Sequence, residues 1–226
     1  MRKIIIMAAI CLTGSILNVI LGKLCIHFGI PLYLDTILTI AVTMTCGLFW
    51  GALCGTLTNF IGHTFWGWGW AGYLFVLCNI ATALVTRLFM QFFPRELNFY
   101  DAPKTQIAYK NSRFSMVMDR VIVLIILSFA LCLAMSFLGG LIAAIIIKSS
   151  PSYNAGEPGI TAIFSETMFT VNMPVIVTEI AARIPVNIVD RLISAFAGFG
   201  IALGLRAILK ISAPPLKQTK RIGFAP

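Results

Sequence analysis

Charged residues are scarce in this chain. Only 11% of its 226 residues are Asp, Glu, Lys or Arg, whereas 59% are hydrophobic. A soluble domain of this size needs far more polar side chains to cover its surface. The apolar residues form long runs, which favour membrane helices over a barrel, because barrel strands show short alternation instead. The composition predicts an all-α integral membrane protein with no separate soluble domain.

Acidic residues are fewer than basic ones. Eight Asp and Glu stand against seventeen Lys and Arg, which gives a formal net charge of +9. Such an excess can indicate nucleic-acid binding, but here the basic residues lie at the ends of apolar runs, as in the cytoplasmic loops of membrane proteins. We therefore expect a lipid bilayer and no nucleic acid as partner. The expected location is the plasma membrane of a bacterium or archaeon, in a multi-pass arrangement.

Motifs for catalysis, metal binding and nucleotide binding are absent. The chain has no GxxxxGK[ST], no HExxH and no GxSxG, which are the usual signatures of a P-loop, a zinc protease and a serine hydrolase. Its six cysteines all lie in apolar segments and none forms a CxxC pair, so they are typical of small buried side chains. We expect no enzymatic activity, no metal site and no cofactor.

Six apolar stretches predict a six-transmembrane-helix bundle over residues 1–210. The first stretch has no clear cleavage site, so we expect it to be retained as a helix. A loop at 92–120, an outer loop at 148–184 with one or two short helices, and a tail at 211–226 complete the chain. The six stretches cover residues 4–26, 34–45, 50–65, 71–91, 121–147 and 185–209.

The basic residues predict the orientation of this bundle. With both termini cytoplasmic, thirteen of the seventeen Lys and Arg lie on the inner side of the membrane. Basic residues are enriched in the cytoplasmic loops of membrane proteins. We therefore expect the loop at 92–120 and the tail in the cytoplasm, and the loop at 148–184 outside.

Small residues recur at helical spacing in the third apolar stretch. Gly51, Gly55, Asn59 and Gly62 lie three or four residues apart on one helix face, after a break at Gly47. Small side chains let membrane helices approach closely. The spacing predicts tight packing of this face against a neighbouring helix.

Ionisable residues inside apolar stretches form the candidate site. A charge at the centre of a bilayer costs roughly 2.5–3.5 kcal/mol on insertion scales, so Asp35, Asp190 and Arg191 need a partner or a function. Arg191 shares a predicted helix face with Asn187, and we expect it to pair with Asp35. The other residues that we expect to bind substrate lie at a similar depth: Asn59, His63, Trp66, Asn79, Tyr153 and Asn187.

Polar groups and aromatic residues around an outward-facing cavity suit an amphipathic small molecule. Alternatively, Asp35 and Arg191 form a purely structural pair, and the tryptophans mark the membrane interface. Both interpretations stay open at this point.

Two segments resemble a known family. The segment YLDTILTIAVTMTCGLFWGALCGTLTNFIG resembles the region of helices 2 and 3 in the substrate-binding S-components of energy-coupling-factor (ECF) transporters, and PVNIVDRLISAFAGFGIAL resembles their last helix. The resemblance implies a subunit that captures a vitamin or similar micronutrient and works with a transmembrane coupling protein and two cytoplasmic ATPases. Family members often dock through two alanines on helix 1, where the nearest match here is Ala9 and Thr13.

Three other functions remain as alternatives. A similar helical arrangement occurs in the sensor regions of some membrane histidine kinases, which implies a sensor module that acts with a kinase in trans. A secondary carrier would use Asp35 or Asp190 as its coupling site, although no internal repeat of the kind common in such carriers is evident. A membrane enzyme is the fourth possibility, but the sequence shows no catalytic set for it.

Overall fold

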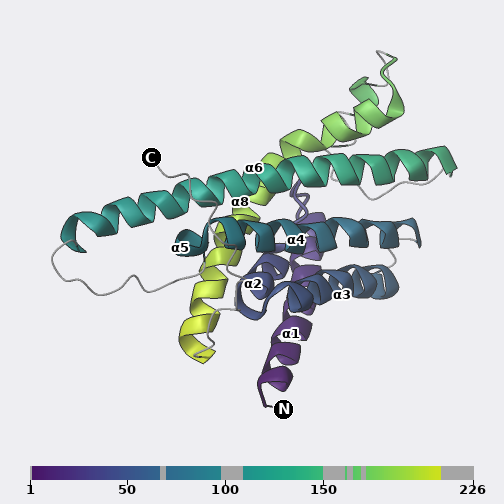
Figure 1. Ribbon diagram of the computed structural model, residues 1–226. Helices are drawn as coiled ribbons and strands as arrows, with labels where there is room; N and C mark the ends of the chain where they lie inside the picture. The colour runs from purple at the N-terminus through teal and green to yellow at the C-terminus, as the bar shows by residue number, and fades with distance from the viewer. Residues whose placement is uncertain are drawn as a thin grey trace.

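The computed structural model describes residues 2–66, 70–97, 109–149, 161, 165–168 and 172–209, and within them the regular elements are helices without strands. This confirms the predicted all-α class. The predicted tail at 211–226 lies outside the described residues. The named elements are α1 (Arg2–His27), α2 (Ile37–Cys46), α3 (Leu48–Trp66), the 3-10 helix η1 (Trp70–Phe75), α4 (Val76–Phe92), α5 (Pro94–Leu97), α6 (Tyr109–Ser149) and α8 (Val175–Leu209) (Figure 1).

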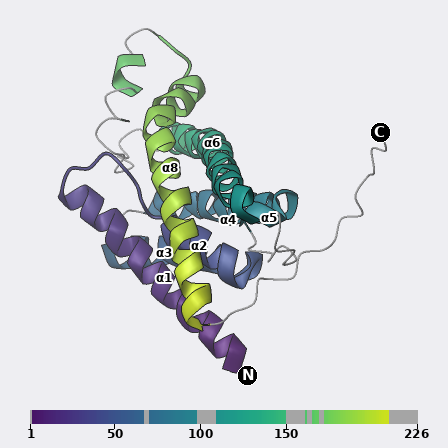
Figure 2. The same cartoon turned by 90° about the vertical axis from the view of Figure 1, so that its left-hand side faces the viewer.

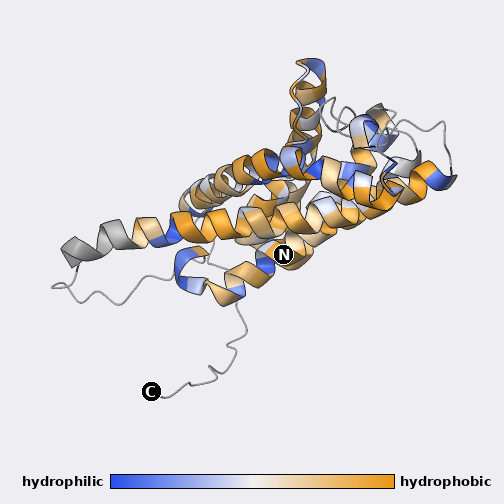
Figure 3. Ribbon diagram, turned by 90° about the horizontal axis from the view of Figure 1, so that it is seen from above, coloured by the Kyte–Doolittle hydropathy of each residue, from blue (hydrophilic) through white to orange (hydrophobic). Residues whose placement is uncertain are grey.

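Four helical spans in the described part are long and apolar enough to cross a membrane. They are Lys3–His27, Gly72–Phe92, Met116–Ser149 and Val175–Leu209. Large apolar side chains are exposed along these helices, and Figure 3 shows α6 as hydrophobic along its middle. Such a surface is unfavourable in water and is matched by lipid. The structure therefore indicates a membrane protein, as the composition predicts.

The short helix α2 lies at the centre of the molecule, among the other helices in both Figure 1 and Figure 2. All of its ten residues are buried, and it contacts α1, α3, α4 and α8. Asn18 of α1 binds its first turn. The Asn18 amide oxygen accepts a hydrogen bond from the N–H of Leu38 (2.9 Å), and the amide nitrogen donates to the hydroxyls of Thr39 (3.1 Å) and Thr58 (3.3 Å). Asn18 thus satisfies a helix-end N–H that the helix itself leaves unpaired.

Glycines bring α3 close to two neighbouring helices. Gly47 separates α2 from α3 with a φ of +97°, a conformation that favours glycine. A Cβ atom added to Gly51 would lie 1.9 Å from the Thr43 hydroxyl of α2, and one added to Gly55 would lie 2.8 Å from the Cβ of Asn79 in α4. All four residues of the predicted small-residue face are buried. The predicted tight packing is confirmed, with the addition that the face meets two helices.

The last helix begins earlier than the sequence predicts. α8 starts at Val175, so Pro185 lies inside the helix and not in its first turn, and residues 175–184 of the predicted loop form the first turns of this helix. Proline removes one helical hydrogen bond, but contact with a neighbouring helix can hold such a segment in membrane proteins. Here α6 supplies that contact, because a Cβ on Gly140 would lie only 2.7 Å from the Cα of Ile180.

The helix α6 also begins earlier than predicted. It starts at Tyr109 and not at Val121, so the expected loop at 92–120 contains α5 and the first turns of α6. No proline or glycine lies between Tyr109 and Val121. The backbone therefore has nothing there to end a helix, and the first turns of α6 continue directly into its long apolar part.

Candidate functional site

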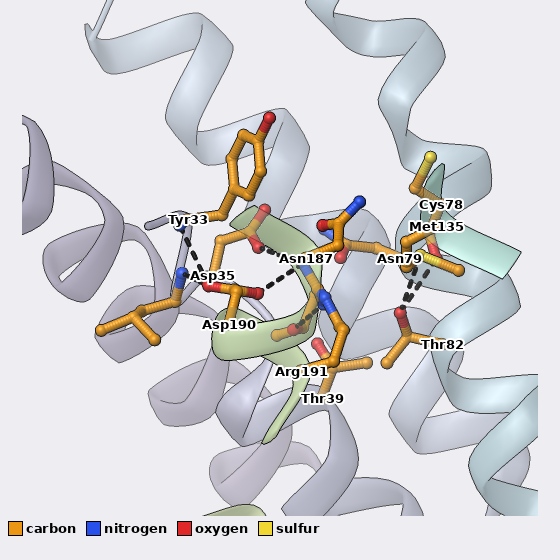
Figure 4. Close-up of polar contacts among 12 residues, drawn as sticks. Tyr33, Asp35, Thr39, Cys78, Asn79, Thr82, Met135, Asn187, Asp190 and Arg191 are labelled. Atoms are coloured by element: carbon orange, nitrogen blue, oxygen red, sulfur yellow. Dashed lines mark hydrogen bonds and ion pairs between the residues drawn. The ribbon is translucent and has the colours of Figure 1, made fainter. Parts of the chain in front are cut away.

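Asp190 joins the middle of α8 to the loop between α1 and α2 (Figure 4). The side chain is fully buried, and its Oδ1 accepts hydrogen bonds from the backbone N–H groups of Tyr33 (3.0 Å) and Leu34 (2.8 Å). Successive N–H groups that converge on one oxygen form an anion-binding nest. Leu34 has a φ of +47°, which is strained for a residue with a bulky side chain. The Asp190 carboxylate therefore holds this loop in an otherwise unfavourable conformation.

Arg191 lies beside Asp190 and contacts two residues that precede α2. Its Nη2 is 2.8 Å from Asp190 Oδ2 and 3.9 Å from Asp35 Oδ1. Its Nη1 donates a hydrogen bond to the hydroxyl of Thr36. The predicted pair of Asp35 and Arg191 is confirmed, but Asp190 is the nearer carboxylate. The predicted helix start at Pro185 placed Arg191 close to the beginning of the helix. Because α8 starts at Val175, Arg191 lies in its middle instead.

Of the three charged residues Asp35, Asp190 and Arg191, Asp35 is the most exposed to solvent. Its side chain is 23% exposed, whereas that of Asp190 is 0% exposed. Burial raises the pKa of Asp35, the Arg191 guanidinium lowers it, the Asp190 carboxylate raises it and the Asn79 side chain lowers it, so that the pKa is raised overall. An ionised carboxylate offers about four acceptor positions, so Asp35 can accept another donor. We call Asp35, Thr36, Asn79, Asp190 and Arg191 the Asp35 cluster.

The polar face of α8 continues on both sides of the Asp35 cluster. Asn187 precedes Arg191 by one turn, and its amide nitrogen donates to the hydroxyl of Ser136 in α6 at 2.9 Å. Ser194 follows by one turn, and its buried hydroxyl has no hydrogen-bond partner among the described residues. The predicted polar face therefore points into the bundle, and Asn187 uses it to bind α6.

Two further predicted site residues, Asn59 and His63, lie on α3. Asn59 donates to the carbonyl oxygen of Gly55 in its own helix at 3.3 Å. The ring of His63 lies 5.0 Å from that of Tyr73 and packs over Gly72. Asn79 of the Asp35 cluster donates to the same Gly55 carbonyl oxygen at 3.4 Å, so Asn59 lies beside this edge of the cluster. His63 instead contacts Gly72 and Tyr73 of η1.

Two aromatic residues complete the predicted site. The side chain of Trp66 and the whole of Tyr153 lie outside the described residues. Their role in the site stays a prediction.

A second buried ion pair escaped the sequence analysis. Arg183 Nη1 lies 2.5 Å from Glu179 Oε2 and 2.8 Å from the Glu179 carbonyl oxygen, with both side chains at most 5% exposed. The pair lies within α8, and the Arg183 side chain passes close to Gly139 of α6. The spacing of four residues is the signal that could have revealed it. It was overlooked because the helix was expected to begin at Pro185.

Ala9 and Thr13, the predicted docking residues, lie on the exposed face of α1. Gly14 and Asn18 lie on the opposite, buried face of the same helix. The small residues of α1 therefore divide into an inner set that packs in the bundle and an outer set that is accessible.

Similarity to known proteins gives no further guidance to the function. No protein-family model, curated protein or solved structure matches the chain. Within the described ranges, no group of three or more His, Cys, Asp or Glu side chains is arranged to hold a metal ion. The chemistry of the Asp35 cluster is thus the main guide to what the site binds.

Proposed function

We propose that this chain is the high-affinity substrate-binding subunit of an ATP-driven uptake transporter, an S-component of the ECF type, for a vitamin or similar micronutrient. The observation that carries the proposal is the Asp35 cluster. Buried ionisable groups in membrane proteins are costly and usually mark functional sites. This one links the loop before α2 to α8, and these are the two regions in which the sequence resembles S-components. The partly exposed Asp35 gives the cluster access to a small molecule.

The proposal includes six membrane crossings with both termini in the cytoplasm, with α2 and α3 as short crossings. In such a bundle the second and sixth helices run in the same direction. The contacts between α2 and α8 agree with this arrangement. Asp190 binds the N–H of Leu34 before α2, and Arg206, further along α8, donates to the carbonyl oxygen of Met44 near the end of α2.

Partner proteins would supply the energy for transport. The sequence holds no P-loop motif, so ATP hydrolysis would come from two cytoplasmic ATPases through a transmembrane coupling protein. Ala9 and Thr13 are exposed on α1, and small residues allow another membrane helix to approach closely. They are the proposed contact for the coupling protein.

Purification from native membranes in mild detergent, followed by mass spectrometry, tests the proposal. We expect a coupling protein and two ATPases to co-purify with the chain. The double variant Ala9→Leu, Thr13→Leu should lose these partners and keep its melting temperature. The control is Gly200→Leu, at an exposed position of α8 where an added Cβ meets nothing within 4 Å. Co-purification of a histidine kinase without ATPases would instead support the sensor.

Site-directed labelling tests the orientation. In a background without the six native cysteines, a membrane-impermeant reagent added outside cells should modify Lys148→Cys, at the exposed end of α6, and spare Arg95→Cys in α5. Modification of position 95 alone would reverse the proposed orientation.

One observation favours a proton-coupled carrier as a second candidate. Asp35 is a partly exposed carboxylate beside buried charged residues, and carboxylates within membrane bundles often serve as proton-relay groups in transporters. Accumulation of a solute against its gradient in proteoliposomes, by the chain alone and without ATP, would establish this function in place of the first.

A further inference from the structure

The charges buried on α8 form two groups that differ in their balance. Glu179 and Arg183 make a neutral pair within the helix. The Asp35 cluster has two carboxylates and one guanidinium, because Asp35 and Asp190 share Arg191. With all three ionised, the described residues leave the cluster one negative charge in excess. An unbalanced charge in a membrane bundle is costly, so a positive group from elsewhere would stabilise it.

The excess charge belongs to Asp35 and not to Asp190. Asp190 is fully buried, its Oδ1 accepts hydrogen bonds from two backbone N–H groups, and its Oδ2 forms a close ion pair with Arg191 at 2.8 Å. Asp35 lies farther from the same guanidinium, at 3.9 Å, and it is the only one of the two carboxylates that is partly exposed. A positive group that approaches the cluster would therefore meet the Asp35 carboxylate.

Arg191 provides a second and independent indication of a ligand. Its side chain is only 5% exposed, yet its Nε–H has no acceptor among the described residues. A buried donor without a partner costs free energy, and a hydrogen-bond acceptor on a bound molecule would remove that cost. The cluster thus offers an acceptor at Asp35 and a donor at Arg191.

These two features fit an organic cation better than a metal ion. Calcium and magnesium require six or more oxygen ligands, whereas this part of the chain offers one carboxylate with spare capacity. A protonated amine or a charged nitrogen heterocycle needs only one carboxylate for a strong charge-assisted hydrogen bond.

We infer that Asp35 contacts a positively charged group of the small molecule that this protein binds, and that this molecule also carries a hydrogen-bond acceptor that reaches Arg191. The inference rests on the proposed function of substrate capture and adds the chemical class of the substrate. It assigns different roles to the two carboxylates: Asp190 holds the loop, and Asp35 binds the ligand.

The test uses the full chain in detergent and the small-molecule fraction of yeast extract as probe. After removal of unbound molecules, mass spectrometry identifies what the protein has enriched. We expect the enriched molecule to be cationic at pH 7. Asp35→Asn should reduce its enrichment about tenfold or more, as the loss of a charged hydrogen bond implies, and Asp35→Glu should retain more. The matched control is Asp119→Asn, at an exposed position of α6, and it should enrich the molecule like the wild type.

The outcomes separate this inference from the proposed function. Enrichment of a neutral or anionic molecule by the wild type overturns the inference and leaves substrate capture standing, even if Asp35→Asn fails to fold. Unchanged enrichment of a cation by a folded Asp35→Asn protein removes Asp35 from the site. If the wild type enriches nothing, both the inference and the proposed function fail.

Discussion

The two ionic groups of α8 share a helix and a buried environment, but they are built differently. Glu179 and Arg183 belong to one element, match in charge and are closed to solvent. The Asp35 cluster draws on the loop before α2, on α4 and on α8, and it retains a partly exposed carboxylate. A balanced pair within one helix needs no ligand to be stable. In the unbalanced cluster, Asp190 makes a structural contact, whereas Asp35 has capacity to bind a positively charged group of a ligand.

The largest effect on stability should come from Arg191→Gln. This change leaves Asp35 and Asp190 close together without a cation, and the loss of one partner from a buried pair costs roughly 3–5 kcal/mol. Chemical unfolding in mixed micelles measures it. Adding Asp35→Asn should recover part of the loss, because one of the two carboxylates is then neutral. Lys148→Gln, at an exposed position, should stay within about 0.5 kcal/mol of the wild type. An unchanged Arg191→Gln protein would mean that the cluster is not buried in the membrane bundle.

Glu179→Gln should destabilise by about 3 kcal/mol, because it removes the carboxylate that pairs with the buried Arg183 guanidinium. In contrast to the Asp35 cluster, the double variant Glu179→Gln, Arg183→Gln should return to within about 1 kcal/mol of the wild type, since replacing both partners of a buried pair is often nearly neutral. The same unfolding assay applies. A double variant as unstable as the single one would show that the pair has a further charged partner.

Gly55→Ala should cost about 1–3 kcal/mol through overpacking. The added Cβ would lie 2.8 Å from the Cβ of Asn79 and would displace a residue whose amide nitrogen donates to the Gly55 carbonyl oxygen at 3.4 Å. Gly200→Ala is the matched control, because its Cβ meets nothing within 4 Å, and it should stabilise the helix by about 0.5–1 kcal/mol. Melting temperatures in detergent compare the two. If both variants melt alike, α3 and α4 are not in close contact.

The smallest effect on stability should come from Asp35→Asn, at about 1 kcal/mol or less in either direction. The pair with Arg191 is long at 3.9 Å, and removal of this charge leaves Asp190 and Arg191 balanced. The unfolding assay used for Arg191→Gln decides the point. A loss as large as that of Glu179→Gln would make Asp35 a structural residue and would erase the difference between the two ionic groups.

The sequence was sufficient for the core of the candidate site. Asp35 and Arg191 are among the few ionisable residues in apolar stretches, so each had few possible partners, and their pairing was predictable from the sequence alone. The close approach at Gly55 was also predictable, because glycines at helical spacing leave room for a neighbouring backbone.

Other parts depended on tertiary contacts that the sequence does not display. The continuation of α8 through Pro185 is accompanied by packing on α6 near Gly140. A helix that starts at Pro185 does not include Glu179 and Arg183, so their pairing could not be predicted. The grouping of His63 with Tyr73 depends on how η1 packs against α3. The positive φ of Leu34 accompanies hydrogen bonds to Asp190, a residue far away in the sequence.

The shortness of α2 has a consequence for the biogenesis of the protein. Ten residues span about 15 Å, half of a bilayer core of about 30 Å, so α2 cannot enter the membrane as an independent unit. Its first turn is bound by Asn18, which the ribosome makes earlier, but Thr36 receives its donor from Arg191, which is made near the end of synthesis. In a nascent chain, the hydrogen bonds at the beginning of α2 therefore stay incomplete until the last helix is inserted. Truncation before α8 should consequently yield a product that cellular quality control degrades.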